Sequence, residues 1–408
     1  MFINLSWMTA EKLLTQLFNM ITGFLILRYL GPSDAGQLFF AFMTCSVLSV
    51  FLHLGLESLI INDLVRRKLN SLRVFWGVLL IRIVLFIPYG ILSIIFLNFL
   101  NSEIDLLLGV ILVLSFIHET VKTALLYFLF PERISRYAQL LLCVSIFIFL
   151  LRILIVEAET GIYGLALTYF VQSLSLAIVF LVAYRCRYGN SIYNTKLLYS
   201  RLTHVYIIGL LSRCRPLFVA SFMSVLTLRI DQFIFNFYFD DELYGLYISA
   251  LRIIEASYIV PLIITSWIYP YLLSSRVNVR LLVLRTNLLL FVIGSIVTFI
   301  TLVWGAEIVS LLLGPSYLEA ADALKWLAFA IPFVYLYSLN KKLLLSQEKN
   351  STVLITSILS VLSISSSVLV GINLYGSIGA IWGYPLGWAL SYLLALLIGL
   401  LHKQEENT

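Results

Sequence analysis

One short apolar stretch of the sequence carries two opposite charges. It reads VLTLRIDQFIFNFYF from Val225 to Phe239, and it places Arg229 and Asp231 among aliphatic and aromatic side chains. A charged group in such surroundings is costly unless it is paired or reaches water. Residues two apart on a helix point about 200° away from each other, so these two side chains do not face one another. We therefore expect their partners on other helices or in an aqueous cavity.

The next apolar segment carries Arg252 and Glu255, three residues apart and therefore on one helix face. A guanidinium is a planar fork of donors that matches phosphate and carboxylate groups. Arg229 and Arg252 are therefore predicted to bind an anionic group of a ligand. Asp231 and Glu255 are predicted to act in coupling or gating, as carriers of a proton or another cation.

Further basic residues within apolar segments are Arg82, Arg28, Lys12, Arg152 and Lys325. The first three join the predicted ligand-binding set. All except Arg82 lie near segment ends, where a long side chain can extend to water. Glu119 and Lys122, three residues apart, are expected to pair with each other.

The four cysteines and four histidines are scattered along the chain. None shows the spacing of a metal site or of a disulfide framework. We expect no metal site, and we expect these residues to be packed individually.

The elements that carry these charges must cross a membrane. The chain of 408 residues is 61% hydrophobic and only 12% charged, whereas a soluble chain averages about 45–50% apolar and about 25% charged residues. No cleavable signal peptide is expected at Met1–Trp7. Segments of about 20 apolar residues predict twelve transmembrane helices at residues 9–29, 37–60, 75–97, 106–128, 138–156, 162–183, 216–236, 245–271, 286–304, 323–344, 352–373 and 379–401. Pro216 suits the first turn of the seventh, which places Arg229 about 20 Å along that helix.

The loops between these helices differ in charge. Most of the 27 basic residues lie in one alternating set of loops. The other set holds no Lys or Arg and several acidic residues; it comprises residues 30–36, 98–105, 157–161, 237–244, 305–322 and 374–378. Because basic loops stay in the cytoplasm, both termini are predicted to be cytoplasmic. Topology thus explains the net charge of +6, and nucleic-acid binding is not expected.

The chain divides into two sets of six helices with similar sequence features. The segments GIYGLALTY and GSIGAIWGY share the pattern G-x-x-G-x-x-x-x-Y and open the last helix of each set. We predict an N-terminal lobe at residues 1–183, a cytoplasmic linker with an interfacial helix at 184–215, and a C-terminal lobe at 216–408. Because six is even, the lobes are parallel repeats, and such repeats hold their substrate near mid-membrane.

Several motifs resemble those of a known family, in the same order along nearly the whole chain. They are RYLGPSDAGQL, LGLESLIINDLVRR, RPLFVASFMSVLTLRIDQFIF, LYGLYISALRIIEA and GPSYLEAADALKWLAFAIPF. The chain resembles the Wzx-type polysaccharide or O-antigen flippases of the multidrug/oligosaccharidyl-lipid/polysaccharide (MOP) exporter superfamily. The family's Asp in the seventh-helix motif falls on Asp231, and its preceding basic position falls on Arg229.

The resemblance implies an all-α, MATE-like fold of two lobes around a V-shaped cleft in the bacterial inner membrane. It implies a cargo of undecaprenyl-pyrophosphate-linked oligosaccharide, flipped from the cytoplasmic to the periplasmic leaflet for O-antigen or capsule synthesis. Partners would be membrane lipids, a proton or Na⁺ gradient and the polysaccharide polymerase. No cofactor and no enzymatic activity are expected, and no GxxxxGK[ST] nucleotide motif occurs in the sequence.

Two other functions are compatible with the sequence. A multidrug exporter of the same superfamily would share the architecture. Cationic drugs favour an anionic cavity, whereas the charged residues deep in the apolar segments of this chain are more often basic. A membrane-embedded glycan polymerase or ligase would have a similar composition but a large outer loop with arginines, and here the outer loops are short.

Overall fold

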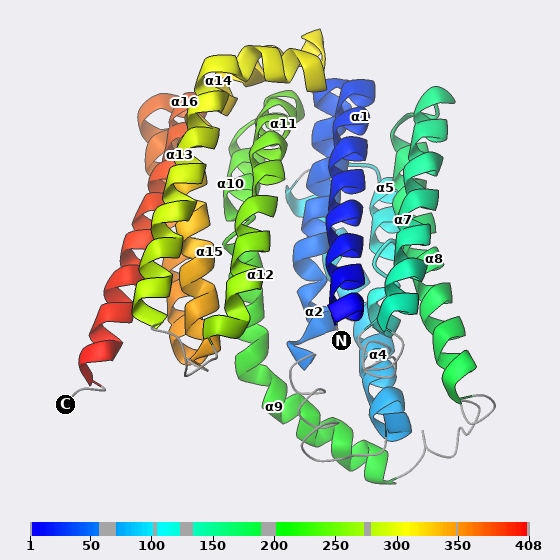
Figure 1. The fold of residues 1–408 in the computed structure, drawn as a ribbon. Helices are drawn as coiled ribbons and strands as arrows, with labels where there is room; N and C mark the ends of the chain where they lie inside the picture. Colours follow the sequence, from blue (N-terminus) through cyan, green and yellow to red (C-terminus); the bar gives the residue numbers. More distant parts are fainter. Residues whose placement is uncertain are drawn as a thin grey trace. The chain divides into compact units, whose positions relative to one another are not determined.

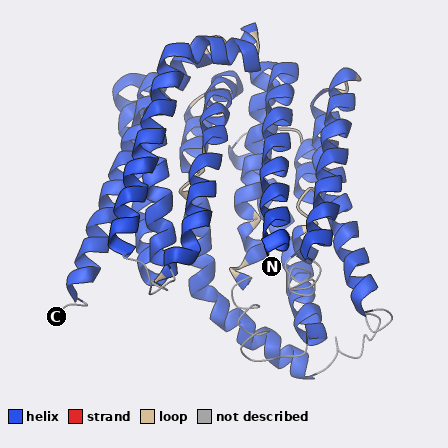
Figure 2. Cartoon of the chain, viewed as in Figure 1, coloured by secondary structure: helices blue, strands red, loops and turns tan. Residues whose placement is uncertain are grey.

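The computed structural model describes residues 2–56, 71–100, 104–122, 134–188, 201–272, 279–347 and 350–405. Within these ranges every regular element is a helix (Figure 2), so the predicted all-α fold is confirmed. The elements in chain order are α1 (Phe2–Leu48), α2 (Val50–His53), α4 (Ser71–Leu100), α5 (Leu106–Leu114), α7 (Ile134–Glu157), α8 (Gly161–Tyr188), α9 (Arg201–Leu226), α10 (Ile230–Tyr238), α11 (Asp241–Ser257), α12 (Ile259–Leu272), α13 (Val279–Leu312), η3 (Pro315–Tyr317), α14 (Ala320–Leu327), η4 (Ala328–Ala330), α15 (Ile331–Ser346) and α16 (Asn350–Glu405).

Nine helices in the described part of the chain are long and apolar enough to cross a membrane. Two of them, at Glu11–His53 and Ser351–Ile398, are 43 and 48 residues long, about twice the length that one crossing needs. Each of these two covers a pair of predicted transmembrane helices. Of the predicted fourth helix, the structure describes α5 and the residues up to Lys122. The chain is a multi-pass membrane protein.

The long helices α1 and α16 each contain a non-helical glycine, Gly31 with φ 77° and Gly376 with φ 63°. Positive φ is readily adopted by glycine and costly for other residues. Residues 30–36 and 374–378 were predicted as loops, and each contains the break between two helices, at Gly31 in one and at Tyr375–Gly376 in the other, with helical residues directly on either side. Pro32 can follow directly because proline suits the first turn of a helix.

The predicted seventh and eighth transmembrane helices are both interrupted. In the seventh, α9 ends at Leu226 and α10 begins at Ile230. In the eighth, α11 ends at Ser257 and α12 begins at Ile259. The position predicted for Pro216 was wrong: α9 begins at Arg201, so Pro216 lies inside the helix. The residues predicted to form an interfacial helix run without a break into the seventh transmembrane helix.

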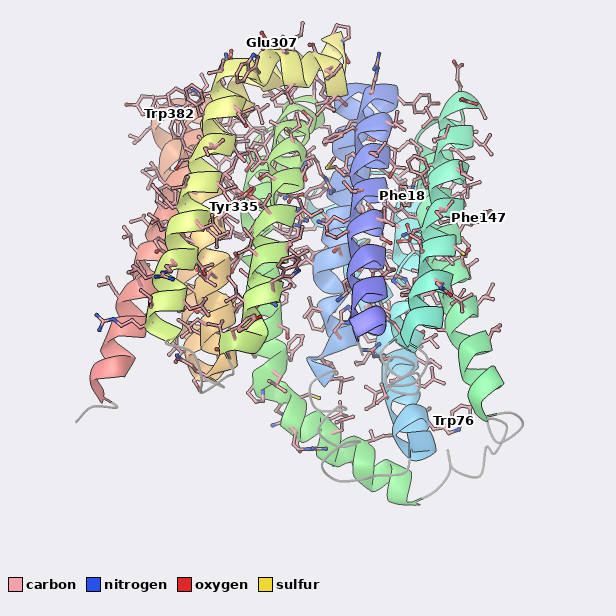
Figure 3. All side chains as sticks on the ribbon, viewed as in Figure 1. Phe18, Trp76, Phe147, Glu307, Tyr335 and Trp382 are labelled. Carbon is pink, nitrogen blue, oxygen red and sulfur yellow. The ribbon has the colours of Figure 1, made fainter. Side chains whose placement is uncertain are left out.

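The ninth predicted helix also extends further than expected. The helix α13 continues past a non-helical Trp304 to Leu312. Figure 1 shows that the chain turns sharply in this region, and Figure 3 places Glu307 on the transverse segment. Because the chain turns at Trp304, the acidic stretch that was predicted as an outer loop begins as helix.

The chain folds into two compact units. Unit 1 consists of Met1–Ile26 and Leu38–Phe222, and unit 2 consists of Leu27–Gln37 and Met223–Thr408. In unit 1, α7 packs on α8, and α5 packs on both α4 and α8. In unit 2, α16 packs on α10 and α15, and α13 packs on α15 and α14.

The segment Leu27–Gln37 packs tightly within unit 2. A Cβ atom on Gly36 would clash with the backbone carbonyl of Asp241, and one on Gly245 would clash with the carbonyl of Pro32. Two facing glycines therefore let the backbones of α1 and α11 touch. Small residues allow membrane helices to pack this closely.

The two halves of α16 are held together by a similar device. Gly379, Gly383 and Gly387 follow one another at intervals of four residues, which places them on one helix face. A Cβ on each would meet backbone atoms of Gly371, of Ser367 and Val368, and of Ile364, respectively. The last two predicted transmembrane helices thus form a close hairpin.

Candidate functional site

The charges found in the seventh and eighth helices lie where those helices are interrupted. Between α9 and α10, the N–H groups of Leu228 and Arg229 donate to the carbonyls of Val225 and Leu226, three residues earlier, at 3.1 and 3.0 Å. Arg229, with φ −134°, directly precedes α10. On the other helix, Glu255 lies in the last turn of α11.

Arg229, Arg252 and Glu255 form one ion-pair cluster in unit 2. A terminal guanidinium nitrogen of Arg229 lies 2.6 Å from Glu255 Oε1, and one of Arg252 lies 3.7 Å from Oε2. The side chains are 25%, 29% and 18% exposed, respectively. The expectation that Arg229 finds its partner on another helix is confirmed. The carboxylate of Glu255 thus contacts both guanidiniums.

Asp231 lies within range of the charge of Arg229 but has a different hydrogen-bond partner. Its side chain is almost completely buried, and the hydroxyl of Tyr247 donates to Oδ2 at 2.6 Å. The ring of Tyr247 stacks on Phe235 at a centroid distance of 4.3 Å. Asp231 also lies in the first turn of α10, where the helix dipole stabilises a negative charge. In the described part of the chain its Oδ1 atom has no hydrogen-bond partner.

Tyrosines lie around the cluster, and they were not among the residues predicted from the sequence to form a site. The hydroxyls of Tyr258 and Tyr384 lie 3.4 Å apart. Tyr335 (Figure 3) donates to the carbonyl of Ser257 at 2.7 Å, at the interruption between α11 and α12. The recurrence of tyrosine in LYGLYI was visible in the sequence, but the contribution of α15 and α16 depends on tertiary packing.

Several polar side-chain atoms on the buried face of α10 have no hydrogen-bond partner among the described residues. Gln232 is fully buried, and among the described residues neither its amide nitrogen nor its amide oxygen has a hydrogen-bond partner. The same holds for Oδ1 of the buried Asn236, one turn further along. Each such group costs about 1–3 kcal/mol, so this face is expensive to bury.

The other predicted ligand-binding residues are described by their own surroundings. Arg28 is exposed and lies beside Gly314, where a Cβ would be 3.7 Å from its Nε. Lys12 and Arg82 belong to unit 1. Lys12 is exposed, whereas Arg82 is fully buried and donates to the backbone carbonyl of Glu119.

Arg152 was predicted to extend to water, and this was wrong, because its side chain is buried. Its terminal nitrogens donate to Thr22 at 3.1 Å and to Gln172 at 2.8 Å, and its guanidinium lies 4.5 Å from the ring centre of Tyr169. Neutral oxygens and an aromatic face replace the water that the prediction assumed. Lys325 instead pairs with the exposed Asp322 at 2.9 Å.

The expected pair of Glu119 and Lys122 is confirmed, with a distance of 2.8 Å between Lys122 Nζ and Glu119 Oε1. The expectation that the histidines are packed individually was wrong for two of them. His118 and His53 both lie next to the Glu119 carboxylate, at 3.1 and 3.5 Å. Their separation of 65 positions leaves no local sequence pattern that would predict the contact.

Three solved structures show which fold this is. The chain is similar to an inward-facing multidrug resistance MATE family transporter of the MOP superfamily, with 15% identity, a TM-score of 0.72, and coverage of 95% of this chain and 94% of the other. It is similar to the lipid II flippase MurJ in an inward closed conformation, with 16% identity, a TM-score of 0.73, and coverage of 96% and 86%. A MOP superfamily transporter from Pyrococcus furiosus matches with 15% identity, a TM-score of 0.65, and coverage of 100% and 94%.

The fold is therefore that of the MOP transporter superfamily, and the predicted MATE-like architecture is confirmed. The chain belongs to the family described as "Polysaccharide biosynthesis protein", whose sequence profile matches residues 2–277. Among curated protein sequences, none matches the chain.

Proposed function

We propose that the protein is a flippase that moves an undecaprenyl-pyrophosphate-linked oligosaccharide across the bacterial inner membrane. The cargo would pass from the cytoplasmic to the periplasmic leaflet for assembly of a surface polysaccharide such as O-antigen or capsule. Family membership in polysaccharide biosynthesis supports the cargo class. Both termini would be cytoplasmic, as the loop charges predict.

One observation carries the proposal: two partly exposed guanidiniums, Arg229 and Arg252, share the single carboxylate of Glu255. A pyrophosphate presents several oxygens to such a pair, and bidentate arginine contacts to phosphate are strong. The anionic ligand would compete with Glu255 for the two arginines. Asp231 accepts a hydrogen bond from the neutral hydroxyl of Tyr247, and its negative charge also acts on Arg229 from the buried side.

The tyrosines next to the cluster suit the remainder of the cargo. Aromatic rings with hydroxyl groups offer both an apolar surface and a hydrogen-bonding end, which matches the two characters of a sugar ring. We propose that Tyr258, Tyr335 and Tyr384 contact the oligosaccharide while Arg229 and Arg252 hold its pyrophosphate. Asp231 and Glu255 would release the anion or couple its movement to an ion gradient.

A multidrug exporter is the second candidate, because the fold is shared with a transporter described as a multidrug resistance protein. In that case the buried carboxylate of Asp231 would attract a cationic drug. The partly exposed arginines favour the flippase, since they would repel such a ligand.

Deletion of the gene tests the proposal. We expect loss of surface polysaccharide and accumulation of lipid-linked repeat units on the cytoplasmic side of the membrane. The wild-type gene should restore export, Arg229→Lys should restore part of it, and Arg229→Ala should restore little at normal membrane abundance, because lysine keeps the charge but loses the fork. Unchanged surface polysaccharide together with increased sensitivity to cationic dyes would instead identify a drug exporter.

A further inference from the structure

Unit 1 contains its own interrupted helix with charged residues at the interruption. After Leu114 the N–H groups of Phe116, Ile117, Glu119, Thr120 and Val121 donate to carbonyls three residues earlier, at 3.1–3.2 Å. Such 3₁₀ geometry within a longer helix often marks a functional position. His118 and Glu119 lie in the middle of this segment.

Glu119 is the centre of a cluster of ionisable side chains. Its Oε1 lies 3.1 Å from His118 Nε2 and 2.8 Å from Lys122 Nζ, and its Oε2 lies 3.5 Å from His53 Nε2. The other ring nitrogen of His118, Nδ1, lies 2.9 Å from Ser173 Oγ on α8. Two of the four histidines of the chain thus meet at one carboxylate.

The charges around Glu119 exceed what a structural ion pair requires. Lys122 already neutralises the carboxylate, and the fully buried Arg82 of α4 brings a second fixed cation to the Glu119 backbone carbonyl. Tyr89, also on α4, is directed elsewhere, to the carbonyl of Cys45 at 3.3 Å. The two imidazoles are therefore not needed to balance Glu119, and a histidine is the side chain whose charge changes most readily between about pH 5 and 8.

The side chains of the cluster differ in how far they are exposed. The exposed fraction of the side chain rises from 8% for Glu119 through 16% for His118 and 27% for His53 to 38% for Lys122. Where His53 faces water, it would be the first imidazole to bind a proton, and Glu119 links it to His118. No electron transfer is involved: the proton leaves water, binds an imidazole nitrogen next to the carboxylate, and later returns to water.

We propose that His53, His118 and Glu119 form a proton-binding site in unit 1, and that this site couples transport to a proton gradient. The coupling part rests on the proposed transport function, whereas the existence of the site does not. Lys122 would hold the Glu119 carboxylate, and Arg82 the Glu119 backbone, while the charge of the imidazoles changes.

Histidine-selective isotope labelling of the full chain in lipid nanodiscs tests the site without any cargo. Magic-angle-spinning NMR can follow the ring nitrogens over about pH 5–8, and His→Gln variants at His53, His118, His204 and His402 assign the signals. We expect the titration curves of His53 and His118 to depend on each other and to change in Glu119→Gln. The curves of His204 and His402 should not change. Independent curves, or curves unaffected by Glu119→Gln, would overturn the proposal.

A transport measurement separates failure of the site from failure of the proposed function. Proteoliposomes with a synthetic undecaprenyl-pyrophosphate-linked oligosaccharide are compared under an imposed pH gradient and an imposed Na⁺ gradient. We expect the pH gradient to accelerate flipping at least several-fold in the wild type, and both His53→Gln and His118→Gln to lose this acceleration while still flipping slowly. Acceleration that persists in both variants would refute the coupling. Absence of flipping in every sample would refute the cargo and leave the NMR result to decide the proton site.

Discussion

At the scale of single residues, Glu255 has the greatest influence in unit 2, because it is the common partner of two arginines. Neutralising it leaves two guanidiniums in a largely apolar environment, where an unpaired charge is costly. Removal of either arginine leaves the other to hold the carboxylate. The cluster therefore tolerates the loss of a cation better than the loss of its anion.

We expect Glu255→Gln to lower both polysaccharide export and thermal stability. The loss of a partner for a charged group costs on the order of 1–3 kcal/mol, and the lower end applies because these side chains are partly exposed. The measurements are export in cells and thermal unfolding of the purified protein. Asp322→Asn is the control: it removes an ion pair in which Asp322 is 85% exposed, and such pairs contribute little. Glu255→Gln with wild-type export and stability would contradict our account of the cluster.

Gln232 allows a test of the polar face of α10. Methionine has a similar shape and needs no hydrogen bond, so Gln232→Met should raise the free energy of unfolding by about 1 kcal/mol or more. Gln172→Met is the matched control and should lower it, because the amide oxygen of Gln172 accepts a hydrogen bond from the buried Arg152. If Gln232→Met were destabilising, the amide would have partners in the membrane-embedded protein, such as bound water.

At the scale of helices, the contact between α1 and α11 depends on two glycines. Gly36→Ala and Gly245→Ala should each destabilise the protein by a few kcal/mol, because each new methyl group would clash with a backbone carbonyl that cannot rotate away. Gly23→Ala is the control on the same helix α1. Nothing lies within 4 Å of its added Cβ, and alanine favours helix by about 1 kcal/mol over glycine. Equal melting temperatures for all three variants would show that the close approach is not required.

The sequence predicted the helices better than the points where they are interrupted. Runs of apolar residues are sufficient to predict a membrane helix, and each predicted helix has a helical counterpart among the described residues. The interruptions near Arg229 and Tyr258 contain no glycine, and Pro216 lies where no interruption occurs. At these interruptions the backbone conformation depends on contacts with residues that are distant in sequence, and no local sequence pattern reveals such contacts.

The candidate site was predictable to a similar extent. The cost of charge in an apolar segment identified Arg229, Asp231, Arg252 and Glu255, because that cost is a property of the segment itself. The assignment of partners, Glu255 for Arg229 and Tyr247 for Asp231, required the packing of α10 on α11. The cluster at Glu119 was missed for the same reason, since its histidines are distant in sequence.

At the scale of the whole molecule, orientation in the membrane is the main open prediction, and it rests on the loop charges. In a variant without the native cysteines, a cysteine at Glu319 should react with an impermeant thiol reagent in intact cells. A cysteine at Ser351 should react only after permeabilisation, because residue 351 follows a basic loop that is expected in the cytoplasm. The reverse pattern at the two positions would invert the topology and with it the proposed direction of transport.

The assignment of Leu27–Gln37 to unit 2 has a consequence for how the gene can be split or recombined. If the gene is cut after the codon for residue 37 and before α11, the first fragment contains residues 27–37 of unit 2. The second fragment then lacks these residues. Neither product alone could fill the contact at Gly36 and Gly245, so the two would be expected to recover function only when made together. When halves of related genes are recombined, residues 27–37 would then have to match the C-terminal half, with which they pack, although the N-terminal half encodes them.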